Sequence, residues 1–229
     1  MTVTKGVSII GAGTNATMIS RAGKVFHVSP GADKAVRISN MMLNIGGYFG
    51  GNYPIEVATS ETSTNLPLYK IRIDHIWFEK GQYTITLTGI NAWGVIDHCT
   101  FHNCDNGVQL NGGSAVWSYP ILAGTTNCMV IEDNLFLCDT KAADMNECIM
   151  SGHGVRFVVR NNTFDGTAYR GNDFLCYENH GKGDLLSSPP TVSDLRGPPI
   201  FEIYNNTMKL YTGYRIINIR GGSGIVFSN

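Results

Sequence analysis

The chain has 229 residues, of which 43% are hydrophobic and 15% charged, and its formal net charge is −1. This length is sufficient for one domain with a sizeable core. The near-neutral charge and the lack of Lys/Arg runs argue against nucleic acid or an anionic membrane as the main partner. No apolar run approaches the roughly 20 residues that span a bilayer, and the start lacks the features of a signal peptide. We therefore expect a soluble domain with neither nucleic acid nor membrane as partner.

Short strand-like segments predominate from the first residues onward. In chain order they include "VSII", "VFHV", "YTITLTG", "VQL" and "RIINI", which are rich in β-branched and aromatic residues. The 27 glycines indicate many tight turns. Only "TKAADMNECI" has a weak helical pattern, and residues 181–199, with four of the eight prolines, form an excursion. The pattern predicts an all-β fold.

One motif with an apolar start, a polar middle and an aromatic end recurs along the chain. Its copies are "ISNMML" (38–43, weaker), "IDHIWF" (73–78), "IDHCTF" (96–101), "IEDNLF" (131–136), "VRNNTF" (159–164) and "IYNNTM" (203–208). They begin 35, 23, 35, 28 and 44 residues apart, which fits a period near 23 with inserted loops. Asn tolerates the left-handed conformation of a tight bend, and identical side chains stacked at about 4.8 Å can form a hydrogen-bonded ladder.

A second repeat lies between these copies and consists of strands that end at glycine. Its copies are "YTITLTG" (83–89), "GVQLNGG" (107–113), "ECIMSGHG" (147–154), "FLCYENHG" (174–181) and "YRIINIRGG" (214–222). Together, the two repeats predict a solenoid with three strands per turn and long loop insertions.

These repeats resemble those of right-handed parallel β-helix proteins of the pectate-lyase-like superfamily, whose rungs are similar in length and carry Asn at a tight bend. The resemblance covers roughly residues 36–229, and "VTKGVSIIGAGTNATMI" is similar to the first rungs of such proteins. A left-handed β-helix would need a regular hexapeptide, which is absent. A leucine-rich repeat is the alternative fold, although Leu is scarce and no helical half is evident.

Both ends of the predicted solenoid look uncapped. The chain stops at Asn229, partway through another copy of the Asn motif, and it begins directly in strand-like sequence. We therefore expect residues 1–229 to be a single β-helix domain truncated at both ends. Exposed rung edges predict self-association end to end.

Stacking of the Asn motifs predicts a column of acidic residues. This column contains Asp74, Asp97, Glu132 and then Arg160, with His75 and His98 alongside. Successive acids would repel one another and raise at least one pKa unless a cation intervenes. Carboxylates one or two rungs apart also fall near the separations used by glycosidases. The alternative interpretation is an exposed face with solvated charges.

The strands that end at glycine predict a second candidate site. Enzymes that this chain resembles bind sugars on that face, between loops. The outward residues there are predicted to be Gln109, Asn111, Ser151, Glu178, His180, Asn218 and Arg220, with Trp117 and Tyr119 stacking on sugar rings. For a lyase, His180 or Arg220 would be the base, and Asp173 and Glu178 complete the catalytic candidates. Polar surface residues without a catalytic role are the alternative.

Calcium is the one cofactor that this second site suggests, with oxygen ligands from Asp165, Asp173 or Glu178. The six cysteines form no CxxC pair and follow the rung spacing, so we expect buried free thiols rather than disulfides or zinc.

Two functions follow. The first is a carbohydrate-active enzyme, similar to polysaccharide lyases or glycoside hydrolases, which could be inactive as a fragment. The second is a noncatalytic glycan-binding or structural β-helix, such as part of a phage tailspike or an adhesin. Polysaccharide is the expected partner in both cases, and an extracellular or virion-associated parent protein would fit either one.

Overall fold

We describe a computed structural model of the chain. It describes residues 1–29, 34–46, 53–58, 69–88, 92–112, 124–139, 147–152, 155–170, 174–179, 197–211, 216–222 and 224–226. All regular structure in these ranges is β-strand, which confirms the all-β prediction and leaves the leucine-rich repeat without its helical half. Within the same ranges, no helix could cross a membrane.

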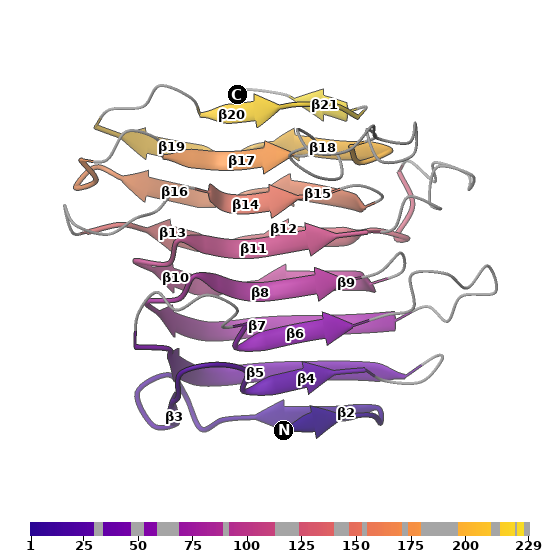
Figure 1. Cartoon of the computed structure of the whole chain (residues 1–229), viewed down its shortest axis with the longest axis vertical. Helices are drawn as coiled ribbons and strands as arrows, with labels where there is room; N and C mark the ends of the chain where they lie inside the picture. Colours follow the sequence, from indigo (N-terminus) through magenta and orange to yellow (C-terminus); the bar gives the residue numbers. More distant parts are fainter. Residues whose placement is uncertain are drawn as a thin grey trace, which may run out of the picture.

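The strands form two parallel β-sheets, and within each sheet the strands follow one another along the long axis of the molecule (Figure 1). The N-terminus lies at one end of this axis and the C-terminus at the other. Among the described residues, the smaller sheet has eight strands. In spatial order they are β1 (Thr2–Val3), β4 (Phe26–Val28), β6 (Ile55–Ala58), β8 (Tyr83–Thr88), β11 (Asn106–Asn111), β14 (Glu147–Ser151), β17 (Leu175–Asn179) and β20 (Ile217–Ile219). From β8 onward these are the predicted glycine-ended strands.

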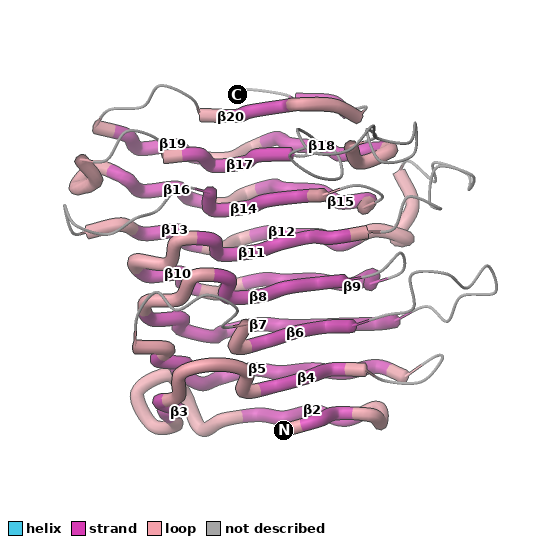
Figure 2. The backbone as a smooth tube through the Cα atoms, in the orientation of Figure 1, coloured by secondary structure: helices cyan, strands magenta, loops and turns pink. Residues whose placement is uncertain are grey.

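The larger sheet has thirteen strands within the described part of the chain and contains the Asn motifs. Its first column consists of β2 (Val7–Ile10), β5 (Ala35–Asn44), β7 (Tyr69–Glu79), β9 (Ala92–Asp97), β12 (Met129–Glu132), β15 (Arg156–Arg160), β18 (Ile200–Tyr204) and β21 (Gly224–Val226). Its second column consists of β3 (Met18–Ser20), the second halves of β5 and β7, β10 (Thr100–His102), β13 (Leu135–Leu137), β16 (Thr163–Gly166) and β19 (Thr207–Leu210). Every pair within the two sheets is parallel, an arrangement that is compatible with a parallel β-helix (Figure 2).

A left-handed residue marks the corner between the two columns. The φ angle lies between 53° and 57° at Asn40, His75, His98, Asp133, Asn161 and Asn205. These are the polar positions of the repeated motif, and Asn, Asp and His are the non-glycine residues most often found in this region. The predicted bend is therefore confirmed at each copy of the motif.

The residue after the corner builds an internal ladder. Asn134 Nδ2 donates to Asn162 Oδ1 at 3.0 Å, and Asn162 Nδ2 donates to Asn206 Oδ1 at 3.1 Å. The predicted Asn ladder is present, but it is formed by the inward Asn of the last three motifs and not by the left-handed residue.

Aromatic rings at the end of the motif stack inside the solenoid. The rings of Phe78, Phe101, Phe136 and Phe164 follow one another with centroids 5.0, 4.6 and 4.8 Å apart. They belong to one apolar cluster of buried residues that also includes five of the six cysteines. All six thiols are free and buried, as predicted.

Candidate functional site

The first candidate site is the acidic column on the larger sheet. Strand register aligns, one rung after another, Ser39, Asp74, Asp97, Glu132, Arg160 and Tyr204. The predicted order of this column is therefore observed. However, Asp74 is 0% exposed and Asp97 only 4%, so the interpretation as solvated surface charges is wrong for these two residues.

Two arginines account for the burial of these acids. Arg37 donates from Nε and Nη2 to the two oxygens of Asp74 at 2.8 and 2.7 Å, and Arg72 contacts Asp97 in the same way at 3.2 and 2.9 Å. Arg72 Nε also lies 3.4 Å from Asp74 Oδ1. Buried carboxylates need such paired donors because burying an unpaired charge is costly. The sequence prediction allowed for an intervening cation but named only Arg160.

The arginines keep Asp74 ionised. Burial of the Asp74 carboxyl opposes ionisation, but hydrogen bonds from Arg37 and His75 outweigh burial and hold the pKa of Asp74 below its usual value. The pKa is therefore not raised at Asp74, in contrast to what repulsion between stacked acids alone would give. A carboxyl that remains ionised is a poor proton donor, so Asp74 is not suited to act as a catalytic acid.

The later part of the column is also paired. Arg160 Nε and Nη2 each lie 2.6 Å from Glu132 Oε2, and Arg160 Nη1 donates to the Tyr204 hydroxyl at 3.1 Å. Hydrogen bonds to Tyr204 and to Glu132 raise the pKa of Arg160. Three side chains from β12, β15 and β18 are thus joined across three successive rungs.

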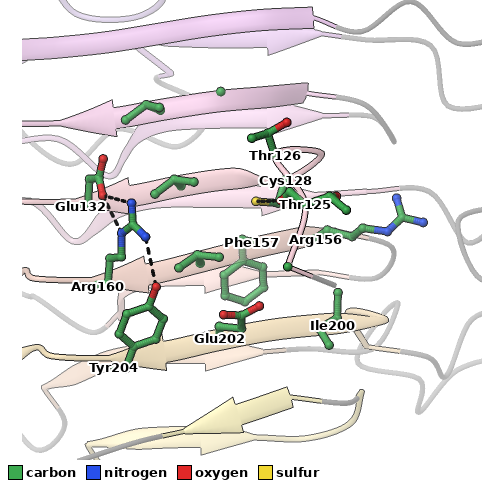
Figure 3. Close-up of a pocket in the computed structure, with 15 residues that line it drawn as sticks. Thr125, Thr126, Cys128, Glu132, Arg156, Phe157, Arg160, Ile200, Glu202 and Tyr204 are labelled. Carbon is green, nitrogen blue, oxygen red and sulfur yellow. Dashed lines mark hydrogen bonds and ion pairs between the residues drawn. The ribbon is translucent and has the colours of Figure 1, made fainter. Parts of the chain in front are cut away.

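These three side chains form one wall of a hollow of about 570 Å³ on the outer face of the sheet. Figure 3 shows Glu132, Arg160 and Tyr204 joined on one side and Thr125 and Thr126 of a loop on the other. Glu202 and Val158 also line the hollow, and Arg156 and Ile200 lie toward its far end.

A second hollow of about 430 Å³ adjoins the first. Both are lined by Gly94, Val95 and Thr126, so they form one surface, which we call the outer groove. The second hollow reaches Ser8 and is lined by Trp93, with three cationic side chains, namely those of Arg37, Lys70 and Arg72. The outer groove therefore crosses the strands from β2 to β18.

The second candidate site lies on the smaller sheet, where three predicted residues come together. Glu178 is 1% exposed. Its Oε1 accepts from Asn218 Nδ2 at 2.6 Å and lies 2.5 Å from Arg220 Nη2. Register also places Glu178 beside Asn218 and in the column of Gln109. Asn111 ends β11, opposite Thr88, and is half-buried.

Ser151 was predicted to face outward with these residues, and the structure corrects this. Ser151 pairs with Leu110 and Asn179, is 0% exposed, and lies 2.8 Å from the Tyr177 hydroxyl, oxygen to oxygen, inside the solenoid. Successive residues of a strand point to opposite faces, so Gly152, and not Ser151, is in register with the outward residue Asn111.

Four predicted site residues, namely Trp117, Tyr119, Asp173 and His180, lie outside the described residues. Of the suggested calcium ligands, Asp165 lies on β16 of the larger sheet and accepts from Thr167, whereas Glu178 lies on the smaller sheet. Over the ranges that the structure describes, no three His, Cys, Asp or Glu side chains are grouped as metal ligands would be. The two suggested ligands that the structure describes, Asp165 and Glu178, therefore belong to different sheets.

Comparison with known proteins gives no relative. No family model, no curated protein and no solved structure matches the chain. Its function therefore has to be inferred from its own fold and side chains.

One polar cluster escaped the sequence prediction. His102 lies between two carboxylates, with Nδ1 2.6 Å from Glu79 Oε2 and Nε2 2.8 Å from Asp139 Oδ2. Trp77 Nε1 also donates to Glu79 at 2.9 Å. The signal was available, because Glu79 and His102 follow the motif aromatics Phe78 and Phe101 by one residue and therefore stack on adjacent rungs.

Proposed function

We propose that this protein is a right-handed parallel β-helix with three strands in each full rung, similar to pectate-lyase-like proteins, and that it binds an extended polysaccharide in the outer groove. The rung assignment is supported by the strand columns: one in the smaller sheet and two in the larger sheet that meet at a left-handed corner. The binding proposal rests mainly on the continuity of the outer groove.

The length of the outer groove suits a polymer. Its lining residues come from β2, β5, β7, β9, β12, β15 and β18, which are consecutive neighbours. Six strand spacings of about 4.8 Å correspond to about 29 Å. A single small molecule would occupy only part of such a surface, whereas several linked sugar units could follow it.

The lining of the outer groove suits hydroxyl-rich sugar units. Trp93 and Tyr204 offer aromatic faces, Thr125 and Thr126 offer hydroxyls, and the arginines offer donors. Arg37 and Arg72 are neutralised by Asp74 and Asp97, and Arg160 by Glu132, so the groove carries little excess charge. This balance favours a neutral or weakly charged glycan over a polyanion.

A panel of neutral and acidic oligosaccharides, read by calorimetry, tests the proposal. We expect Trp93→Ala to weaken binding of the best oligosaccharide about tenfold or more, since aromatic anchors often contribute more than about 1.4 kcal/mol. Trp93→Phe should retain most of the affinity. Tyr211→Ala, which alters an aromatic residue that is 62% exposed and does not line the outer groove, is the matched control. Equal affinity of wild type and Trp93→Ala, with circular dichroism unchanged, would refute the proposal.

The second candidate function is glycan cleavage, lyase-like or hydrolase-like, on the smaller sheet. It is supported by the cluster of Glu178, Asn218 and Arg220, all predicted as site residues. The same panel, read by reducing ends and by the ultraviolet absorbance of unsaturated uronates, with and without Ca²⁺, tests this function. Product formation that Glu178→Gln abolishes would support the enzyme, and the absence of product from every glycan would exclude it for this chain.

We also propose that copies of the chain associate end to end. Large apolar side chains are exposed on strands at both ends of the stack, namely Val7, Ile10 and Met18 on β2 and β3, and Ile219, Ile225 and Val226 on β20 and β21. Sedimentation at micromolar concentration should show oligomers that Ile225→Lys weakens. A monomer at every concentration would contradict this proposal.

A further inference from the structure

Two histidines form a matched pair at the corners of adjacent rungs. His75 and His98 both have left-handed φ angles, and their rings stack with centroids 5.0 Å apart and planes within 4°. Their side chains are 49% and 53% exposed. Both rings are therefore accessible from solvent while being held side by side.

The orientation of each ring is fixed by the aspartate that precedes it. His75 Nδ1 lies 2.9 Å from Asp74 Oδ2, and His98 Nδ1 lies 2.9 Å from Asp97 Oδ2. Each carboxylate is in turn held by an arginine through two hydrogen bonds. An ionised carboxylate only accepts hydrogen bonds, so a neutral histidine in this position carries its hydrogen on Nδ1. The lone pair is then on Nε2 in both rings.

We propose that His75 Nε2 and His98 Nε2 together bind one divalent first-row transition-metal ion, with Cu²⁺ bound more tightly than Ni²⁺ or Zn²⁺. Imidazole nitrogens suit these ions, and the order of affinity follows the general series. A carboxylate that accepts from the second ring nitrogen is the usual support for a histidine ligand, because it fixes the tautomer and the ring orientation. Here the support occurs twice, on adjacent rungs.

The ring spacing is close to what one shared ion requires. Two nitrogens that each lie about 2.1 Å from one ion are about 3 to 4 Å apart, depending on the bond angle. A bound ion lies near the plane of each imidazole, so these rings, which are parallel to within 4° with centroids 5.0 Å apart, must also tilt toward each other, and their half-exposed side chains leave room for this tilt. Water would complete the coordination, since the described part of the chain offers no cluster of three or more metal-binding side chains. Asp133, exposed at the next corner, adds negative charge nearby.

Titration of the purified chain with Cu²⁺ and Zn²⁺, followed by calorimetry and by electron paramagnetic resonance for Cu²⁺, tests this site. We expect one saturable ion per chain with two nitrogen ligands in the Cu²⁺ spectrum. His75→Gln and His98→Gln should each weaken binding about tenfold or more and leave at most one nitrogen ligand. Unchanged affinity and an unchanged spectrum in both variants would overturn the proposal, as would the absence of saturable binding.

Two further variants separate this site from other histidines. His102→Gln is the matched control, because both nitrogens of His102 are already engaged by carboxylates, and it should bind Cu²⁺ like the wild type. Asp97→Asn retains both ligands but allows the His98 tautomer to change, so we expect about a 10- to 100-fold loss of affinity.

Nitrogen-15 spectra of the imidazoles would report the tautomer directly, and hydrogen on Nε2 of both rings in the metal-free chain would also overturn the proposal. No glycan is involved in these measurements, so the outcome is independent of polysaccharide binding.

Discussion

Asn161 and Asn162 are adjacent in the sequence but have different structural roles, and their substitution should therefore have very different effects on stability. Asn161 occupies the left-handed corner with φ 57°. Asn162 points inward and is 1% exposed. Its Nδ2 donates to the carbonyls of Ile131 and Arg160 at 2.9 and 3.0 Å, and its Oδ1 accepts from Asn134 N and Nδ2, both at 3.0 Å.

The cost of Asn162→Ala follows from the groups that it leaves unpaired. Two buried donors of Asn134 lose their acceptor, and each unsatisfied buried group costs about 1 to 3 kcal/mol. Allowing for partial relaxation, we expect a loss of about 3 kcal/mol in the free energy of unfolding. Asn161→Gly should change it by less than about 1 kcal/mol, because glycine adopts positive φ without strain.

Urea unfolding followed by circular dichroism measures both variants, and hydrogen exchange of the β12, β15 and β18 amides shows whether the loss is local. If Asn162→Ala were as stable as Asn161→Gly to within about 0.5 kcal/mol, the reasoning that the inward Asn ladder stabilises the stacked rungs would be refuted.

Three other predictions concern pH and backbone geometry. Burial would lower the pKa of His102, but hydrogen bonds to Glu79 and Asp139 outweigh burial and raise it. The stability that protonated His102 gives the fold is therefore full below about pH 6.5 and is lost as pH rises through the raised pKa. Urea midpoints against pH should show this decline in the wild type and not in His102→Gln. The lowered pKa of Asp74 gives stability that is present above about pH 4 and is lost as pH falls through the folded-state pKa. Arg37→Gln should therefore move the midpoint of acid unfolding to higher pH. An unmoved midpoint would count against the pairing of Arg37 with Asp74. Gly94 has φ 150°, and an added Cβ would lie 1.8 Å from Ile71 O. Gly94→Ala should therefore lower the free energy of unfolding, measured in urea, by about 3 kcal/mol or more. A variant as stable as the wild type would show that the two strands can separate at this position.

The sequence was sufficient to predict the strands of the two repeats and the register of the Asn motifs. The reason is physical: each rung must turn the same corner, so Asn, Asp or His recurs at His75, His98, Asp133 and Asn161, and the aromatic residue after it recurs in the core. Such a repeat is visible without any knowledge of tertiary contacts.

The partners of the site residues were harder to predict. Arg37 and Arg72 reach the acids of the following rung, so the pairing depends on an offset of two residues combined with a step of one strand. The sequence repeat alone does not show whether Ser151 or Gly152 faces outward, because the two residues are adjacent at the end of β14. Side chains whose role depends on a diagonal contact or on one residue of register cannot be assigned from a repeat alone.

Hydrogen–deuterium exchange with and without the tightest-binding oligosaccharide of the panel tests the central claim most directly, because it locates the bound glycan on the chain. We expect protection of backbone amides at Trp93–Val95, in β12 and in β15, which line the outer groove. Protection confined to β17 and β20 of the smaller sheet, or none at saturating oligosaccharide, would contradict it.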